Sequence, residues 1–456
     1  MNRRSPVLLG LLLLAAPPMA HAQLICTTNV GAITITGYSG TNGAVVIPAA
    51  TNGLPVTSIG ESAFYSTPVA SVTIPSSVTN IGDYAFQSCV NLTNVILTNG
   101  LTSAGDFAFQ YCSRLAGLTL PASLASIGDD AFDSCISLTN VTIPGTVTNI
   151  AANAFFYCLG LTNVTISNGV ANIGDDAFWR CASLAGVSIP PSVTNIGVSA
   201  FEGCTAMTAI TVDSQNPAYS SLNGVLFDTN QTTLIEYPGG LGGSYATPAG
   251  VTSIGEFAFA SCAGLTAVTL SESVTNIATG AFEDCPSLTS VNLPAAIASI
   301  GSFAFFDCAG LTNFTIPASV TNLGDYAFSY CSSLTAVYFD ANAPAADSTL
   351  FANSGNVTVY YLPGATGWST LFAGRPTVVW DPQIQAADSN FGVRSNLFGF
   401  DITGPSNLVV VVEASTNLAA PDWAPLQTVT LSNGLFYFSE PLQTNAVARF
   451  YSLGPP

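Results

Sequence analysis

Basic side chains are almost absent from this chain. Its 456 residues include 7 Lys+Arg, all of them arginines, and its one histidine, His21, lies near the amino terminus. Nucleophilic catalysis by a Ser-His-Asp or Cys-His group, a lysine Schiff base and a P-loop each need a lysine or histidine in the folded protein, as does a histidine-ligated metal. With 26 Asp+Glu the formal net charge is −19. Nucleic acid and anionic membranes are therefore poor partners, because both require a basic surface.

Charged residues of either sign are also scarce, at 7% of the chain against about 25% in an average globular protein. The acidic pairs that remain are Asp129-Asp130, Asp175-Asp176 and Glu283-Asp284. Adjacent carboxylates at the start of a turn point in different directions, which does not suit glycoside hydrolysis. There is no G-x-S-x-G motif and no glycine-rich phosphate loop. We therefore predict a protein that is not an enzyme and has no cofactor.

The amino terminus has the features of an export signal. Arg3 and Arg4 precede an apolar stretch from Val7 to Ala16, and Ala20-His21-Ala22 is an A-x-A cleavage site. The apolar stretch is shorter than the roughly 20 residues that span a bilayer. We predict that residues 1–22 are a signal peptide, so that 5 basic and 26 acidic residues leave the exported chain with a charge of −21. The protein is then secreted or at the cell surface, with no membrane insertion after signal removal.

A repeat of 23 residues occupies most of the chain. Each unit contains an Ala-Phe pair, a cysteine three residues after the phenylalanine, and an apolar residue three further on. The phenylalanines are Phe64, Phe86, Phe109, Phe132, Phe155, Phe178, Phe201, Phe259, Phe282, Phe305 and Phe328. The cysteines are Cys89, Cys112, Cys135, Cys158, Cys181, Cys204, Cys262, Cys285, Cys308 and Cys331. In the two end units Thr67 and Ser354 replace the cysteine, as expected for caps that face solvent.

The pattern inside one unit predicts three short elements. Ala, Phe, Cys and Leu at i, i+1, i+4 and i+7 predict a short helical turn. The alternating segment from Leu138 to Pro144 predicts a strand, and an apolar pair such as Val193 and Ile196 predicts a second, shorter strand. One such unit has too little apolar surface to fold alone, whereas stacked units share a core. The fold class is therefore a mainly β solenoid.

The repeated blocks Ser77 to Phe86 and Leu138 to Pro144 resemble the bacterial surface leucine-rich repeat proteins of the BspA-like, or treponemal, type. The resemblance covers about residues 54 to 380 and includes an irregular unit at 213–250, between Cys204 and Cys262. It implies a leucine-rich repeat solenoid in a secreted or surface-displayed binding or adhesion protein. The resemblance carries no catalytic residues over to this chain.

The expected organisation has four parts. They are the signal peptide at 1–22, an N-terminal cap at 23–53, the leucine-rich repeat solenoid at 54–382 and a small β-sandwich at 383–456. The last part loses the repeat and contains five alternating segments that predict strands. These segments are Leu397 to Ile402, Leu408 to Ala414, Trp423 to Val429, Leu435 to Ser439 and Arg449 to Leu453.

Two positions recur in successive units with the same residue type, and we call each such set of residues a column. Each column allows either a structural or a chemical interpretation. One cysteine per unit beside the phenylalanine predicts a ladder of buried free thiols, with disulfides between neighbouring units as the alternative because export permits oxidation. The absence of CxxC spacing argues against zinc. An acid three residues before the phenylalanine is expected to cap the start of its own turn. Calcium between adjacent units is the alternative, with Asp83, Asp106 and Asp129 as its ligands.

The exposed side of the main strand is the candidate binding surface. Seven residues after each cysteine stands an outward position that is mostly a hydroxyl or amide. These positions are Ile96, Thr119, Thr142, Thr165, Ser188, Thr211, Thr269, Asn292, Thr315 and Tyr338, of which the eight from Thr119 to Thr315 are the candidate binding residues. Threonine also prefers exposed strands for structural reasons. The functional interpretation is a scaffold that binds an extracellular protein or polysaccharide through this face. A structural envelope component and a carbohydrate-binding accessory protein are the alternatives.

Large side chains lie between the phenylalanine and the cysteine in several units. They are Tyr111, Phe156, Tyr157, Trp179, Arg180, Phe306 and Tyr330. Such residues form an exposed stripe that stacks on sugars or on a partner, or they cover the joints between units. The sequence leaves both interpretations open.

Overall fold

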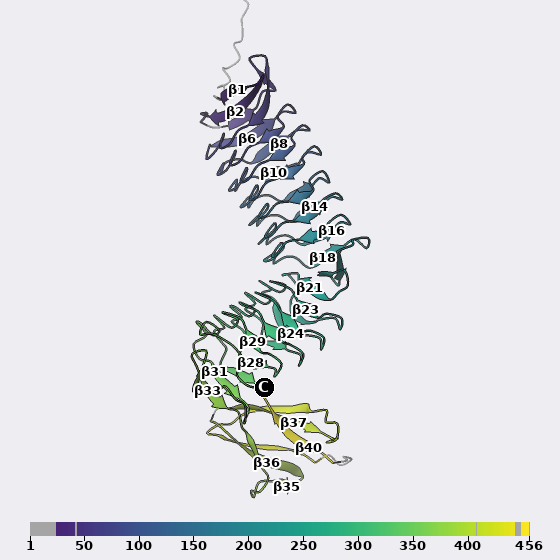
Figure 1. The fold of residues 1–456 in the computed structure, drawn as a ribbon, viewed down its shortest axis with the longest axis vertical. Coiled ribbons are helices and arrows are strands. Elements are labelled where there is room, and N and C mark those ends of the chain that lie inside the picture. The colour runs from purple at the N-terminus through teal and green to yellow at the C-terminus, as the bar shows by residue number, and fades with distance from the viewer. Residues whose placement is uncertain (1–23, 42, 407, 443–447, 456) are drawn as a thin grey trace, which may run out of the picture.

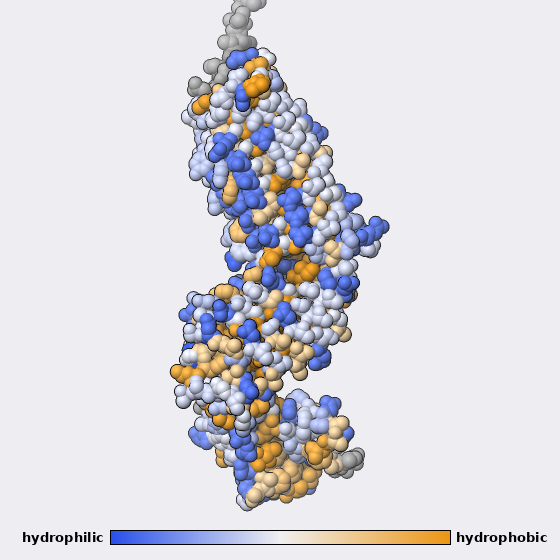
Figure 2. Space-filling model, viewed as in Figure 1, coloured by the Kyte–Doolittle hydropathy of each residue, from blue (hydrophilic) through white to orange (hydrophobic). Residues whose placement is uncertain are grey.

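The computed structural model describes residues 24–41, 43–406, 408–442 and 448–455. Within these residues every regular element is a β-strand, and no helix is long and apolar enough to cross a membrane. The predicted signal peptide at 1–22 lies outside the described residues. The strands stack into an elongated solenoid whose two arms meet at an angle, with a sandwich at the C-terminal end (Figures 1 and 2). The fold class expected from the repeat is confirmed.

The longer strand of each coil lies on one side of the solenoid. In the regular coils neighbouring strands pair in parallel one repeat apart, for example Thr142 with Thr165. The pairing is interrupted between β10 and β12, between β14 and β16, and between β26 and β28. The long strands are β3 (Gly43–Val46), β6 (Val69–Ile74), β8 (Asn94–Leu97), β10 (Gly117–Leu118), β12 (Asn140–Ile143), β14 (Asn163–Ile166), β16 (Gly186–Ile189), β18 (Ala209–Val212), β22 (Gly243–Ala246), β24 (Leu265–Thr269), β26 (Ser290–Asn292), β28 (Asn313–Ile316), β30 (Ala336–Phe339), β31 (Thr358–Tyr361) and β33 (Arg375–Val379), with β32 (Leu371–Phe372) antiparallel to β33.

The shorter strands form a second wall, mostly two residues wide. They are β5 (Leu54–Ile59), β7 (Asn80–Ile81), β9 (Ser103–Ala104), β11 (Ser126–Ile127), β13 (Asn149–Ile150), β15 (Asn172–Ile173), β17 (Asn195–Ile196), β23 (Ser253–Ile254), β25 (Asn276–Ile277), β27 (Ser299–Ile300) and β29 (Asn322–Leu323). At the amino end the hairpin of β1 (Leu24–Asn29) and β2 (Ala32–Tyr38) pairs with β5, as does β4 (Ala50–Thr51). Tyr38 stacks on Phe64 with ring centroids 5.2 Å apart, so this first coil covers the end of the aromatic core.

The segment predicted as a short helical turn is instead a run of hydrogen-bonded turns. The N–H of Gln87 donates to Tyr84 O in its own coil, whereas the N–H of Phe86 donates to Ala108 O in the next coil. Tyr84 and Ser88 have φ angles of 57° and 60°, in the left-handed region, which an α-helix excludes. Half of the backbone N–H groups in this segment therefore donate to carbonyl groups of the neighbouring coil. The helix prediction was wrong because these carbonyl groups are within reach only once the coils have stacked.

The core is a column of aromatic rings flanked by alanine, cysteine and leucine. Consecutive phenylalanine rings from Phe64 to Phe201 and from Phe259 to Phe328 lie 4.8–5.5 Å apart and nearly parallel. This spacing is that of neighbouring strands. The buried residues fall into two clusters, one ending at Leu226 and one beginning at Val225. The irregular unit therefore divides the solenoid into an N-arm, up to β18, and a C-arm, from β19 to β33.

The irregular unit is built from three antiparallel strands. They are β19 (Tyr219–Leu222), β20 (Val225–Asp228) and β21 (Thr233–Glu236). β21 then pairs in parallel with β23 and restarts the second wall. The hairpin also covers the end of the N-arm, where the N–H of Ile196 donates to Tyr219 Oη at 2.8 Å. The irregular unit predicted at 213–250 thus both ends one arm and begins the next.

The chain after the repeat forms two packed antiparallel sheets. One contains β34 (Gln383–Gln385), β35 (Gly392–Arg394), β36 (Leu397–Thr403) and β39 (Leu435–Pro441), and the other contains β37 (Val409–Ser415), β38 (Ala424–Thr430) and β40 (Phe450–Gly454). Phe400, Val410 and Phe438 are buried between them. All five segments predicted as strands are strands, while β34 and β35 were not predicted.

Candidate binding surface

The cysteine column has a structural role. Each thiol of the column donates a hydrogen bond to the carbonyl of the aromatic residue one coil earlier, which is a phenylalanine except for Cys262, as from Cys158 Sγ to Phe132 O at 3.2 Å. Ser354, which replaces the cysteine in an end coil, makes the same bond to Phe328 O at 2.7 Å. All the cysteines are free, and every one in the repeat is buried. The predicted ladder of buried free thiols is confirmed.

These thiols are expected to be unreactive in the folded protein. Burial raises the pKa of Cys135 and of the other nine cysteines of the column, so little thiolate forms near neutral pH. We expect a thiol reagent to modify only Cys26, which is exposed, until denaturant is added, when all 11 cysteines react. Mass spectrometry after labelling measures the number of modified sites. Rapid native labelling within the column would contradict this prediction.

The acidic column binds the backbone of the next coil. The N–H of Asp106 donates to Asp83 Oδ1 at 3.0 Å, and the same bond recurs from Asp129 to Asp106 and from Ala152 to Asp129. The prediction that each carboxylate caps its own turn is therefore wrong. Each carboxylate instead caps the start of the turn in the next coil. Among the described residues no three Asp, Glu, His or Cys side chains are grouped to hold a metal ion. Calcium at these three aspartates stays a prediction.

The outward side chains of the long strands form the surface that we call the front face. Nearly all the predicted binding residues are exposed on it. Thr119 follows β10, Thr142 and Thr165 lie side by side on β12 and β14, and Ser188 faces Thr211 on β16 and β18. In the C-arm Thr269 lies beside Asn292, and Thr315 is half-buried. The structure thus places these side chains in one row on each arm.

Two hollows lie on the front face, both beside interruptions in strand pairing. The N-arm hollow has a volume of about 500 Å³ and is lined by Thr165, Ser188 and Thr211. The C-arm hollow has a volume of about 420 Å³ and includes Thr269, Asn292 and Thr315. Where two strands are not paired, their facing N–H and C=O groups are open to a ligand or to water. Six of the predicted residues therefore line concave sites rather than a flat wall.

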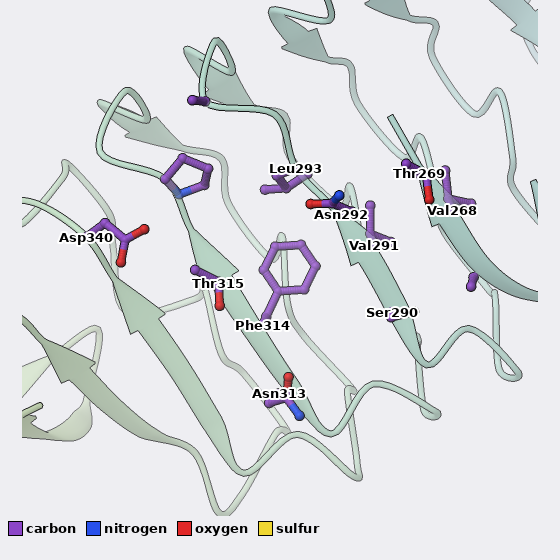
Figure 3. A pocket seen from close by; sticks show the side chains of 13 residues that line it. Val268, Thr269, Ser290, Val291, Asn292, Leu293, Asn313, Phe314, Thr315 and Asp340 are labelled. Carbon is purple, nitrogen blue, oxygen red and sulfur yellow. The ribbon is translucent and has the colours of Figure 1, made fainter. Parts of the chain in front are cut away.

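Figure 3 shows the C-arm hollow across β24, β26 and β28. Thr269, Asn292 and Thr315 project from these three strands, and Asp340 lies at the rim beyond β30. Burial raises the pKa of the Asp340 carboxyl group. The hollow thus combines hydroxyl and amide groups with one carboxyl, and it can both donate and accept hydrogen bonds.

The front face ends where the sandwich covers it. Tyr338, at the outward position of β30, is 3% exposed and packs with Trp380 and Phe400. Tyr360, its neighbour on β31, stacks on it at 5.0 Å. The expectation that Tyr338 continues the exposed row was therefore wrong, because the sandwich buries this side chain. Two consecutive outward tyrosines in a row of hydroxyls were a signal of this contact.

The exposed aromatic stripe is present on the turn edge. Tyr111 and Tyr330 are each 48% exposed. Phe156 is half-buried and stacks on Trp179 at 4.5 Å, so this pair joins two coils. The structure thus shows a pair that covers a joint between coils, whereas contact of the exposed Tyr111 and Tyr330 with a sugar or a partner stays a prediction.

The stacked parallel coils define a leucine-rich repeat solenoid. More narrowly, the chain belongs to the BspA type leucine-rich repeat family, whose profile matches in six copies over residues 57–185, 105–233 and 244–363. No curated protein matches the chain.

Solved structures place the fold in the same group. A leucine rich cell surface protein of Faecalibacterium prausnitzii is 33% identical, with a TM-score of 0.66 over 75% of this chain and 93% of that one. The pneumococcal vaccine antigen PcpA is 21% identical, with a TM-score of 0.60 over 79% and 98% of the two chains. A leucine-rich repeat protein of Bacteroides ovatus is 22% identical, with a TM-score of 0.52 over 79% and 98%. The last two show a shared fold.

Proposed function

We propose that the mature protein is a secreted or cell-surface scaffold without catalytic activity that binds an extracellular protein or polysaccharide through its front face. The observation that carries the proposal is the coincidence of the hydroxyl row with the two hollows. Support for the location comes from the signal-like residues 1–22 and from the cell-surface relative of Faecalibacterium prausnitzii.

The composition of the front face favours many weak polar contacts. Thr142 and Thr165 are exposed, and the hydroxyl of Thr211 donates to Val187 O at 3.3 Å while remaining exposed. No lysine is present and arginine is rare, so the scaffold has little means of attracting a partner by positive charge. A long extended ligand suits such a surface, because regularly spaced contacts add along its length.

Binding of the mature chain to glycan arrays and to extracellular matrix proteins tests the proposal. Replacing Thr142, Thr165 and Thr211 together by arginine is expected to weaken binding at least about tenfold, because three bulky cations then fill the face. Thr148→Arg is the matched control, since Thr148 is an exposed threonine beside the second wall.

Equal affinity of the triple variant and the control would overturn the assignment of binding to the front face. If the mature chain binds no glycan and no matrix protein, the binding function itself fails and a structural envelope component is favoured. Thermal denaturation of each variant checks that the fold is retained.

A further inference from the structure

The turn edge of the irregular coil is shorter than that of its neighbours. Tyr237 takes the place of the phenylalanine, with its ring 5.0 Å from Phe259, and Cys262 Sγ donates to its carbonyl. In the next coil nine residues lead from Phe259 to Val268, whereas eight lead from Tyr237 to Tyr245, which is paired with Val268. These residues begin with Pro238, Gly239 and Gly240, which place no long side chain on this edge.

The coils on either side close over this short edge. A Cβ atom on Gly239 would lie 3.3 Å from Cys204 O in the coil before and 3.7 Å from Ser261 O in the coil after. Ser261 Oγ also donates to Glu202 Oε1 at 3.2 Å, which links these two coils directly although the irregular coil lies between them. The result is a depression at the junction of the arms, which we call the notch.

The notch is a hollow of about 340 Å³ on the turn edge, separate from the front face. Its lining comes from both arms and consists of Tyr157, Leu159, Arg180, Ala182, Gly203, Thr205, Ser261, Ala263 and Asp284. Arg180 and Asp284 belong to coils four steps apart, which a regular stack would separate by about 19 Å. Both nevertheless line one hollow, where Ser261 and Glu202 are hydrogen-bonded across the irregular coil.

Arg180 is held in place but lacks an anionic partner. Its guanidinium carbon lies 4.4 Å from the centre of the Trp179 ring, and no carboxylate of the described residues forms an ion pair with it. Gly203 lies beneath it, with φ of +72°, and a Cβ atom there would be 2.6 Å from Arg180 Cγ. A side chain at position 203 would therefore displace the arginine, whereas glycine leaves its donor groups at the notch.

The charges around the notch select against simple ions. Asp284 lines it, and burial and then the Asp307 charge raise the pKa of this carboxyl, while the Arg180 charge opposes them. Glu202 and Glu283 lie close by, and burial together with Glu202 raises the pKa of Glu283 to about 7. These carboxyl groups repel an anion, and Arg180 repels a cation. A neutral ligand that both donates and accepts hydrogen bonds can bind to the carboxyl groups and to Arg180 together.

We propose that the notch binds a neutral sugar unit of a glycan. Hydroxyl groups of the sugar donate to Asp284 and accept from Arg180, and an apolar face of the ring packs on Tyr157, which is 37% exposed. The volume is at the lower end of the range for small-ligand sites, about 300–1,000 Å³, and suits one or two sugar rings. This site is independent of the front face.

Titration of the mature chain with neutral gluco-, manno- and galacto-oligosaccharides tests the proposal by calorimetry. We expect binding of at least one series, with a loss of at least about tenfold in affinity for Arg180→Ala and for Asp284→Asn. Arg114→Ala is the matched control, because Arg114 is the other arginine between residues 5 and 374 and is exposed. It is expected to leave affinity unchanged.

The front-face triple variant separates this site from the proposed function, since it is expected to retain oligosaccharide binding at the notch. Failure of every neutral oligosaccharide to bind at millimolar concentration would overturn the proposal. So would equal affinity of the Arg180 and Arg114 variants, or binding of acidic or amino sugars alone. Melting temperatures of the three variants confirm that each remains folded.

Discussion

Replacing Phe155 by alanine is expected to lower the free energy of unfolding by about 3–5 kcal/mol. Phe155 is fully buried, and its ring lies 5.2 Å from Phe132 and 5.4 Å from Phe178. The substitution leaves a cavity in the middle of the N-arm, where the neighbouring rings are held by their own coils and have little freedom to fill it. Denaturant unfolding followed by circular dichroism measures the loss.

Tyr111→Ala is the matched control, because Tyr111 is an aromatic residue of the same arm and is 48% exposed. Its removal is expected to change stability by no more than about 0.5 kcal/mol. A loss at Phe155 no larger than that at Tyr111 would mean that the aromatic column does not hold the coils together. The two arms of a solenoid can unfold in separate transitions. The stabilities of the Phe155 and Tyr111 variants are therefore compared in the unfolding transition of the N-arm.

The second large effect is expected at Glu236, where acid rather than neutral pH should favour folding. Glu236 occupies the inward position that is alanine in ordinary coils and is 7% exposed. Burial and the nearby Glu202 raise the pKa of its carboxyl group well above the ordinary value. Cys204 and Cys262 are the other titratable groups that face it. No group of the described residues donates it a hydrogen bond, so its charged form is poorly solvated.

The direction of the pH effect follows from proton linkage. A carboxyl group whose pKa is raised by folding favours the folded state most below its unfolded pKa, about 4.3, and this advantage is lost as pH rises through the folded value. Asp130 and Asp176, with pKa raised to about 6, and Glu283, raised to about 7, act in the same direction. We therefore expect the melting temperature to fall as pH is raised from about 5 to about 8.

Glu236→Gln is expected to reduce this pH dependence and to raise the melting temperature at about pH 8 above that of the unaltered protein, because the neutral amide removes the cost of ionising a buried carboxyl group. Glu256→Gln is the control, because Glu256 is exposed in the next coil. Melting temperatures across the pH range measure both variants. Identical pH profiles for the Glu236 variant and the unaltered protein would contradict the prediction.

The repeat could be predicted in detail because the residues of each column meet the same local packing requirement in every coil. Phe155, Cys158 and Leu161 are inward in each unit for the same reason, and the free state of Cys158 follows from its burial beside the ring. The strands of the sandwich, such as β37, were found from alternation alone. The residues of the candidate surface were placed correctly for the most part, because alternation along a strand determines which side chains point outward.

The elements that were missed depend on contacts between segments far apart in the chain. Asp83 was expected to cap its own turn, but its carboxylate accepts from the N–H of Asp106 in the next coil. Tyr338 was expected to be exposed, but the sandwich that buries it begins more than 40 residues later. The two hollows arise where strand pairing is interrupted, a feature of how the coils stack rather than of any one coil.

The amino-acid sequence by itself determined the period, the inward columns, the elongated stack and the near absence of basic side chains. These follow from local pattern and composition, because a coil that cannot bury its apolar side alone must be covered by another coil. Only the tertiary structure decided that turns replace the helix, where the front face ends, and that Arg180 and Asp284 line one notch. Each of these depends on hydrogen-bond partners and packing surfaces supplied by other coils or by the sandwich, which exist only once the chain has stacked.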